Sequence, residues 1–402
     1  MNIVGNARYP REIRERAMRM VREHRRELVA ATTAIVLVVA PNSGAATTKR
    51  VQMGLPPGVQ KKFDSLKSDV DAFFPAIVSV HVGGTVRFVP DRPRASGVSQ
   101  SLLRQPNANV GYHTVDFPAR GRGPLAFVTP VGEKADQRDA AGARFWFRGF
   151  DVFGANPKLL TRTFGTTLRY DGSKRLTSGL PEIGVARPVT VRFTRAGTYT
   201  YFCNIHPGMK GIVRVLPKGT LVPTVAADRK AVSAQVKAAL RTAKSLVHSR
   251  VARRVKNKKL RINVGLAGAG GVERFAFARA SFSVRRGTTV KFAMPAASRE
   301  THTAATGPGD PTQDDSYLGK LAKSFESTSA DPIASFPSDA PTLGAVGLTP
   351  KLHGNGFWNT GVLDAFAPSL PPADQSVRFS KAGTYRFYCL IHPFMRTTIT
   401  VR

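Results

Sequence analysis

Cysteine is scarce in this chain of 402 residues, which contains only Cys203 and Cys389. Two cysteines form at most one disulfide, so a disulfide framework is excluded as the basis of the fold. Apolar runs are short too: the uncharged stretch 28–40 has thirteen residues, fewer than a membrane span needs. Histidine occurs eight times, and the sequence His-Cys-His is absent. The length allows two or three domains, each with its own core.

Acidic residues are few, with 26 Asp and Glu against 60 Lys and Arg, and the formal net charge is +34. Such a balance favours an anionic partner: nucleic acid, anionic lipid, acidic cell-envelope polymers or an acidic protein. The body of the chain contains no zinc knuckle, helix-turn-helix or aromatic platform for RNA, so we do not expect nucleic acid as the partner. We expect an acidic protein, with acidic envelope polymers or an anionic membrane surface as further candidates.

Residues 1–46 have the composition of an export leader. Arginines precede the run 28–40 and small residues follow it, so we expect a signal peptide cleaved near Ala45 or Ala46. No cysteine lies at this boundary, which excludes a lipoprotein anchor. The 27 residues ahead of the run are long for a leader, and translation is expected to begin at Met18 or Met20. The protein is therefore expected outside the cytoplasm, either secreted, periplasmic or bound to the cell envelope; a retained amphipathic anchor is the alternative.

The most informative feature is a stretch that occurs twice. Phe193–Val215 reads FTRAGTYTYFCNIHPGMKGIVRV, and Phe379–Val401 reads FSKAGTYRFYCLIHPFMRTTITV. In each, a β-prone run ends on the cysteine, with a His three positions later and a Met three positions after the His. Residues three apart in a regular strand face opposite sides, so these side chains meet only if the chain leaves the strand at the cysteine and turns tightly. Pro207 and Pro393 fit such a turn.

A second histidine lies upstream of each cysteine. His113 in GYHTVDF precedes Cys203 by 90 residues, and His302 in ETHTA precedes Cys389 by 87. The matched spacing indicates an internal duplication. A thiolate, two imidazoles and a weak thioether are the donors of a blue-copper electron-transfer site, since thiolate is a soft ligand and copper heads the divalent affinity order. On the two loops, the expected metal ligands are Cys203, His206 and Met209 in the first half and Cys389, His392 and Met395 in the second.

These motifs resemble those of the cupredoxins, the plastocyanin-like blue-copper proteins, and CLIHPFM is especially similar to the amicyanin variant. The resemblance covers about residues 78–217 and 260–402. It implies one eight-stranded Greek-key β-sandwich per half, with copper between the loops at one end. It also implies that the loop histidines, His206 and His392, lie near the surface as electron ports. It further implies that the upstream histidines, His113 and His302, complete the two ligand sets and are buried, each with a hydrogen bond on its second ring nitrogen.

The second stretch departs from the pattern at two positions, because Phe394 and Thr397 stand where the first has Gly208 and Gly211. His353, in KLHGNGF, is a reserve candidate for the fourth ligand of the second site. The remaining histidines are scattered and are expected to have surface or structural roles: His24, His81 and His248.

Short strands, Gly and Pro turns and the lack of a long helix inside either half predict a mainly β fold with two sandwiches. Val78–Phe88 and Phe282–Phe292 each indicate a strand, a turn and a second strand, and Leu260–Leu266 indicates a further strand. Apolar residues at helical spacing predict a short amphipathic helix within 56–75, packed on the first sandwich. Ala143–Phe153 is typical of an added hairpin or a lid.

A basic helix is expected to join the halves. Residues 225–261 carry twelve Lys and Arg after Asp228 and no acid, with apolar residues along one face. This helix is either a linker packed on one domain or a contact for an anionic surface. The expected organisation is a leader at 1–46, a short helical segment at 47–77, sandwiches at 78–217 and 260–402, and the basic helical linker at 218–259.

We expect an electron carrier that cycles between Cu(I) and Cu(II), with redox proteins as donor and acceptor, rather than an enzyme. Two-domain cupredoxin enzymes, such as nitrite reductases and oxidases, connect the blue site to a second copper through a histidine beside the cysteine. Here the flanking residues are Phe202 and Asn204 in one half, and Tyr388 and Leu390 in the other. An open metal position for a substrate is therefore not indicated. A two-domain multicopper enzyme and a non-redox copper-binding envelope protein are the alternatives.

Overall fold

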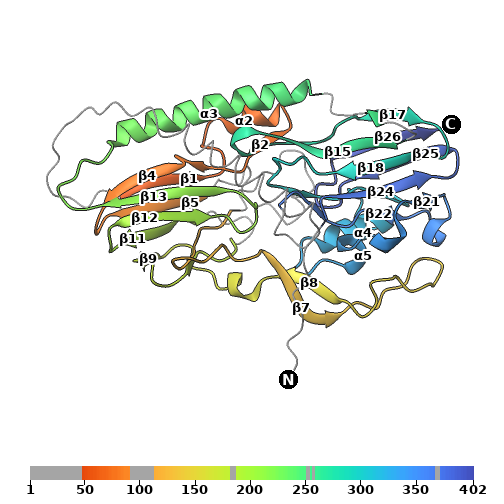
Figure 1. Cartoon of the computed structure of the whole chain (residues 1–402), viewed down its shortest axis with the longest axis horizontal. Helices are drawn as coiled ribbons and strands as arrows, with labels where there is room; N and C mark the ends of the chain where they lie inside the picture. The colour runs from red at the N-terminus through yellow and green to blue at the C-terminus, as the bar shows by residue number, and fades with distance from the viewer. Residues whose placement is uncertain (1–47, 91–112, 182–186, 250–253, 256–258, 367–371) are drawn as a thin grey trace. The chain divides into compact units, whose positions relative to one another are not determined.

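The computed structural model describes residues 48–90, 113–181, 187–249, 254–255, 259–366 and 372–402. The expected leader, with the run 28–40 and His24, lies outside these residues. Ala45–Arg402 forms one compact unit. The fold of this unit is mainly β, as predicted, and contains two β-sandwiches (Figure 1).

The first sandwich consists of two five-stranded sheets. Alternation of buried and solvent-facing residues, as in Val189, Val191 and Phe193, directs one face of each strand into the core. One sheet contains, in order, β3 (Phe73–Phe74), β1 (Thr48–Met53), β5 (Thr85–Pro90), β11 (Val189–Phe193) and β9 (Thr167–Tyr170). The other contains β10 (Leu176–Thr177), β6 (Asp116–Phe117), β12 (Gly197–Phe202), β13 (Lys210–Leu216) and β4 (Ile77–His81).

The second sandwich repeats this plan. One sheet contains, in order, β2 (Ser68–Val70), β16 (Val272–Phe277), β15 (Lys259–Gly268), β18 (Thr289–Ala293), β24 (Asp374–Phe379) and β21 (Val346–Leu348), with β14 (Arg254–Val255) beside β15. The other contains β17 (Ser281–Val284), β26 (Arg396–Val401), β25 (Gly383–Tyr388), β20 (Ala305–Thr306) and β22 (Trp358–Asn359). A small ladder joins β19 (Thr301–His302) to β23 (Leu363–Asp364).

The strand orders of the two sandwiches correspond position by position. In the first, β1 is parallel to β5, β5 antiparallel to β11, and β11 parallel to β9. In the second, β15, β18, β24 and β21 have the same order and directions. The predicted strand–turn–strand segments are present in both halves, with left-handed glycines Gly83 and Gly287 in the turns. Because the two strands of each segment enter different sheets, the turns are sandwich corners rather than hairpins.

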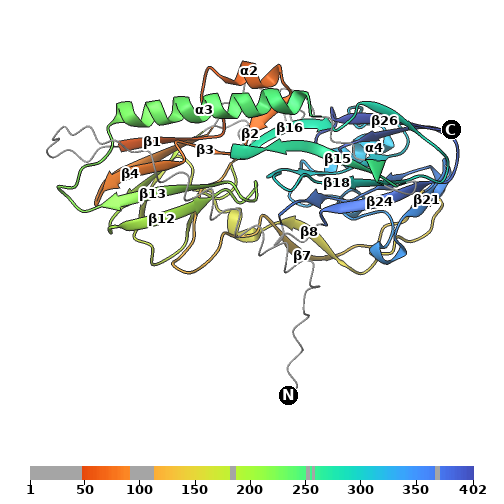
Figure 2. The same ribbon diagram turned by 45° about the horizontal axis from the view of Figure 1, so that its top comes forward.

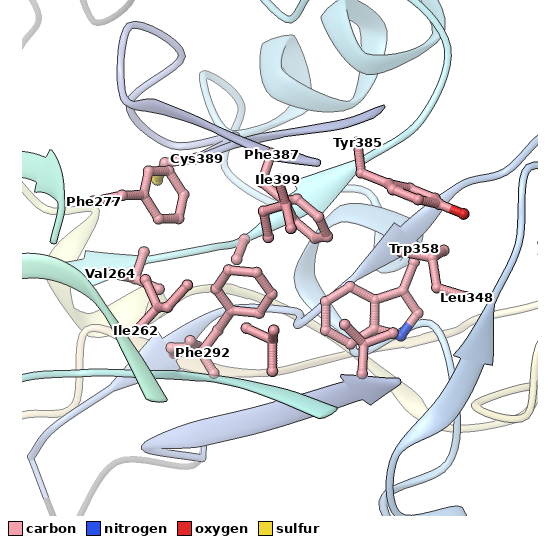
Figure 3. Packing of buried hydrophobic residues seen from close by; sticks show 14 of the residues in the cluster. Ile262, Val264, Phe277, Phe292, Leu348, Trp358, Tyr385, Phe387, Cys389 and Ile399 are labelled. Carbon is pink, nitrogen blue, oxygen red and sulfur yellow. The ribbon is translucent and has the colours of Figure 1, made fainter. Parts of the chain in front are cut away.

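Each sandwich has an aromatic core that includes its cysteine. Figure 3 shows the core of the second half, where Phe292, Phe387 and Trp358 fill the interior and Cys389 belongs to the same cluster. The ring centroids of Phe292 and Phe387 are 4.7 Å apart. The core of the first half holds Cys203 in the same way. Each thiol is therefore at the boundary between a dry core and a loop.

The basic helix is α3 (Val225–Val247), which is shorter than the sequence predicted. The Thr224 side chain accepts a hydrogen bond from Ala227 N and caps its first turn. Ala239, Ala243 and Leu246 are buried against residues of β15 and β16, and α3 contacts those strands directly. The helix also contacts the first sandwich, where Gln235 Nε2 donates to Phe73 O and Lys49 pairs with Asp228, so it packs on both halves rather than on one domain. In the part of the chain that the structure describes, no helix is both long enough and apolar enough to cross a membrane.

The helix predicted within 56–75 is confined to α2 (Gln60–Asp64), which lies beside α3 (Figure 2). The apolar residues that suggested a longer helix pair as strands instead: β2 joins β16 of the second sandwich, and β3 joins β1 of the first. The helix ends at Asp64 with Ser65 as its C-cap, and Lys67, with a φ of 52°, lies between the helix and β2. The first sandwich also includes β1, which precedes the range assigned to it from the sequence.

The segment around Ala143–Phe153 contributes a hairpin of β7 (Val128–Lys134) and β8 (Asp151–Ala155). This hairpin belongs to the first half by sequence but packs with α4 (Tyr317–Ser324) and α5 (Pro332–Ser335) of the second half (Figure 1). Phe147 stacks on Phe336 with ring centroids 5.1 Å apart, and Trp146 Nε1 donates to Pro337 O. Short 3₁₀ turns complete the described structure: η2 (Pro157–Leu159), η3 (Ala269–Gly271), η4 (Pro341–Leu343) and η5 (Leu352–Gly354).

Candidate metal centres

The loop that follows β12 folds back on itself, as its spacing predicted. The strand ends at Phe202, and Cys203 N donates to Met209 O at 3.0 Å. Met209 N donates to His206 O at 3.0 Å, and Gly208 adopts a φ of +87° that a side chain would strain. These bonds close a tight loop between β12 and β13, so that the cysteine, the histidine and the methionine leave the strand register.

The first group of donors is formed by Cys203, His206 and His113. Cys203 Sγ lies 3.5 Å from His206 Nδ1 and 3.9 Å from His113 Nδ1, and the two Nδ1 atoms are 3.0 Å apart. Thr114 N donates to the sulfur at 3.4 Å, next to the upstream histidine. Met209 is fully buried in the same core cluster as the cysteine.

The second group repeats this geometry with Cys389, His392 and His302. Cys389 Sγ lies 3.8 Å from His392 Nδ1 and 3.7 Å from His302 Nδ1, and the two Nδ1 atoms are 3.1 Å apart. Thr303 N donates to the sulfur at 3.3 Å, in the position that Thr114 occupies in the first half. Met395 is buried in the core cluster with the cysteine, and Cys389 N donates to Met395 O at 3.1 Å.

Both groups fit a transition metal. In the plane of each triangle of sulfur and two nitrogens there is a point about 2 Å from all three atoms, which is the reach of metal–nitrogen bonds and close to that of metal–sulfur bonds. Both ring nitrogens that face the sulfur are Nδ1, so each Nε2 is left for a second contact. A soft thiolate with two imidazoles selects copper over the hard cations that prefer oxygen.

The two thiols differ in their electrostatic surroundings. Burial raises the pKa of Cys203, but His206 and His113 beside it lower the pKa by more, and the net pKa is well below the usual value of 9.0. Burial lowers the pKa of His206, whereas Asp71, Glu300 and the thiolate raise it well above its usual value. The metal-free first site therefore favours a thiolate paired with an imidazolium.

The metal-free second site instead favours a neutral thiol beside two neutral imidazoles. Burial raises the pKa of Cys389 above 9.0, although backbone N–H groups from Thr303, His392 and Ile391 oppose the shift. Burial lowers the pKa of His302 to about 3 and that of His392 below its usual value. Cys389 therefore keeps its proton in the metal-free protein at neutral pH.

The loop histidines do not lie at the surface, which corrects the expectation that they are exposed ports. His206 Nε2 lies 3.4 Å from Glu300 Oε1, and His392 Nε2 lies 3.9 Å from Glu300 Oε2. Asp71 Oδ1 is 3.8 Å from His206 Nε2. The side chains of His206 and His392 are only 9% and 17% exposed. Each loop is covered because the segments carrying Asp71 and Glu300 pack over it.

The prediction that the second ring nitrogen of His302 makes a hydrogen bond is wrong. Its Nε2 is buried and has no hydrogen-bond partner among the described residues. A bulge in β15 places Gly265 against the ring, and a Cβ there would lie 2.5 Å from Nε2. The imidazole is thus oriented by close packing instead of by a polar partner.

His353 is not a ligand of the second group. Its Nδ1 lies 3.1 Å from Asp139 Oδ2 and its Nε2 lies 3.3 Å from Asp339 Oδ1, so it joins the inserted hairpin segment to the second half. His81 Nε2 contacts Thr220 O at 2.6 Å, in keeping with a structural role.

Two acidic residues at the centres were missed by the sequence analysis. Glu300 lies two positions before His302, but an isolated Glu in a polar loop gave no signal. Asp71 lay in a segment interpreted as helix. A third carboxylate, Glu273, holds the loop by accepting from Ser298 Oγ and Arg299 N. Together with His206, Asp71 and Glu300 form a further group of donors close enough to consider for a metal ion.

A scan against protein-family models found no match, and a search of curated proteins found none either. Solved structures similar to this chain include amicyanins. A mutant amicyanin with Cu(I) is 14% identical, over 37% of this chain and 87% of that chain, with a TM-score of 0.20. Amicyanin from Paracoccus versutus is 13% identical, over 38% of this chain and 93% of that chain, with a TM-score of 0.21. The interpretation of the two centres rests on their own geometry.

Proposed function

We propose that this protein binds one copper ion in each half and carries single electrons between redox partners. The observation that carries the proposal is the matched pair of donor triangles, each with one thiol and two inward-facing Nδ1 atoms. Copper bound there would take up and release one electron by cycling between Cu(I) and Cu(II).

The protein's own residues supply the conditions for such a site. Cys203 and Cys389 provide the thiolates, and the two histidines of each group hold the plane. Met209 and Met395 are proposed as the weak fourth ligands, because each is buried beside its cysteine on the loop that ends at the methionine. The N–H bonds from Thr114 and Thr303 to sulfur stabilise the thiolate charge. The aromatic cores exclude water from the sulfur side.

A carrier is favoured over an enzyme by the donor inventory. Among the described residues, the groups suited to a metal are the two thiol triangles and one acidic group that shares His206 with the first triangle. A catalytic metal position with its own set of histidines is not among them. The absence of His-Cys-His agrees with this.

The location and partners are proposed on charge and on the leader. With a net charge of +34, the protein would attract acidic redox proteins, and acidic envelope polymers or an anionic membrane surface are further candidates. The composition of residues 1–46 supports export, and we propose a secreted, periplasmic or envelope-bound protein.

Copper loading tests the proposal. The purified chain is loaded with Cu(II), the metal is counted, and the intense visible band of a copper–thiolate bond is recorded. We expect two coppers per chain and two blue signals, of which Cys203→Ser removes one and Cys389→Ser the other. A colourless loaded protein would contradict the function, and a single signal lost in only one variant would restrict it to that half.

A further inference from the structure

The space between the two metal groups contains a carboxylate that contacts both. Glu300 directs Oε1 to His206 Nε2 at 3.4 Å and Oε2 to His392 Nε2 at 3.9 Å. Each of these histidines has its Nδ1 in a different donor triangle. The contacts therefore form a continuous path from one triangle, through one imidazole, one carboxylate and the other imidazole, to the second triangle.

We propose that Glu300 is a bridge that couples the two copper sites, so that an electron crosses between them inside the chain. This inference rests on the proposed function. When Nδ1 binds a metal, the neutral ring keeps its proton on Nε2, and each Nε2–H then faces one oxygen of the same carboxylate, at 3.4 Å for His206 and at the longer distance of 3.9 Å for His392, of which only the first is within hydrogen-bonding reach. With copper in both triangles, one electron would pass from the reduced site, whose Cu(I) would become Cu(II), to the oxidised site, whose Cu(II) would become Cu(I). Both protons stay on their nitrogens, so the exchange needs no co-reactant.

The position of Glu300 is fixed by its surroundings. Glu273, which is 1% exposed, accepts from Ser298 Oγ and from Arg299 N, the two residues that precede Glu300. Arg299 Nη1 also donates to Asp71 O, which ties this loop to the first-half segment that covers His206. A chain with few acids has thus clustered three carboxyl groups here: Glu300 contacts both loop histidines, Asp71 contacts one of them, and Glu273 holds the loop that carries Glu300.

A metal ion held by Asp71, His206 and Glu300 is the competing explanation. It would require His206 to bind metals at both ring nitrogens, and so to lose both of its N–H protons. It would also leave unexplained why the second oxygen of Glu300 faces His392. The bridge uses both oxygens and leaves each ring with one proton.

The test follows the redistribution of a single electron in the fully loaded chain. One equivalent is delivered by a fast photochemical reductant, and the two blue signals, assigned with the Cys203→Ser and Cys389→Ser variants, are followed in time. Copper count, the two absorption bands and both reduction potentials are measured on the same samples. We expect Glu300→Gln to slow the exchange by about tenfold or more, because one Nε2–H then faces an amide NH₂ instead of an acceptor.

Two further variants distinguish a bridging role of Glu300 from the effect of its negative charge alone. Asp71→Asn changes the other carboxyl group beside His206 but touches no second histidine, and we expect its exchange rate to stay within about twofold of the unsubstituted chain. Glu300→Asp keeps the charge but is too short to reach both rings, and we expect it to slow the exchange as Gln does. It also serves if Glu300→Gln fails to fold.

The outcomes distinguish the inference from the function. Two intact blue signals with equal exchange rates in Glu300→Gln, Glu300→Asp and Asp71→Asn would overturn the bridge and leave the carrier function standing. A third metal per chain that is lost in Glu300→Gln would also overturn it. Absence of both blue signals in the unsubstituted chain would instead overturn the function on which the bridge depends.

Discussion

The two metal-binding loops have nearly the same ligand geometry in different surroundings. The sulfur-to-nitrogen distances are 3.5 and 3.9 Å around Cys203, and 3.8 and 3.7 Å around Cys389. Yet the pKa of the first thiol is lowered and that of the second is raised. Geometry is set by the loop backbone, whose Cys N–H to Met C=O bond occurs in both halves. The acidity of Cys203 is set by His206 and His113, and the pKa of His206 is in turn raised by Asp71 and Glu300 from outside the loop.

One of the two glycines lost from the second loop shows how the geometry survives. A Cβ at Gly211 would lie 2.3 Å from the ring and hydroxyl of Tyr201, its cross-strand partner. In the second half the same pair is Thr397 and Phe387, which lacks the hydroxyl. The larger residue at Thr397 is therefore accompanied by a smaller one, Phe387, on the neighbouring strand. Thr397 thus does not argue against a metal at the second site.

The largest effect is expected from a substitution that makes the two halves differ in stability. Phe147 lies in the first half but stacks on Phe336 of the second. We expect Phe147→Ala to lower the free energy of unfolding by about 3–5 kcal/mol, because a fully buried ring is lost. The blue signal of Cys389 should weaken at lower denaturant than that of Cys203. Phe117→Ala, in the first core, is the matched control with the opposite order. Equal loss of both signals in both variants would show that the halves unfold together.

The second-largest effect on stability is expected when Gly211 and Tyr201 are replaced by the residue types of the corresponding pair in the second half. Gly211→Thr should destabilise the first half by about 2 kcal/mol because the new Cβ meets the Tyr201 ring. Adding Tyr201→Phe recreates the pair of the second half, and part of the loss should be recovered. Denaturant unfolding of the single and double variants gives the coupling energy. If the two changes were simply additive, the cross-strand explanation would be wrong.

The pKa difference predicts a difference in thiol reactivity in the metal-free protein. At pH 7, Cys203 should react with iodoacetamide about tenfold faster than Cys389, since the thiolate is the nucleophile. Between pH 7 and 9 the rate at Cys203 should rise less than that at Cys389, because the pKa of Cys203 is well below the usual 9.0. The rate at Cys389 should rise with pH, because its pKa is raised. Peptide mass spectrometry measures the alkylation rate of each cysteine, and parallel pH profiles would contradict the difference in pKa between the two thiols.

The smallest effect concerns Asp71, whose two oxygens are buried and have no hydrogen-bond partner among the described residues. Burial raises its pKa well above the usual 3.8, so ionising it costs the folded protein free energy as the pH rises above that value. Asp71→Asn should therefore stabilise the metal-free chain by about 1 kcal/mol at pH 7. The gain should vanish near pH 3, where the unfolded carboxyl is also protonated. Unfolding at both pH values measures it, and an equal gain at pH 3 would refute the charge explanation.

The sequence predicted the local features and missed the long-range ones. The mainly β fold and the loop after each cysteine follow from strand alternation, turn residues and spacing, which act between near neighbours. The covered loop histidines could not be predicted in this way, because Glu300 and Asp71 come from segments with no pattern of their own. The short helix at Gln60–Asp64 shows the same limit: apolar spacing suited a helix, but pairing with strands of both sandwiches decided the outcome.

The inserted hairpin also affects the order in which contacts form while the chain is being synthesised. Phe147 and Trp146 leave the ribosome roughly 190 residues before Phe336 and Pro337, which they contact in the finished protein. At about 5–20 residues per second, the aromatic side of the hairpin waits about 10–40 s for its partner. During that interval the aromatic residues of the hairpin lack the partners that bury them in the finished protein, and transiently exposed apolar surface of this kind favours aggregation.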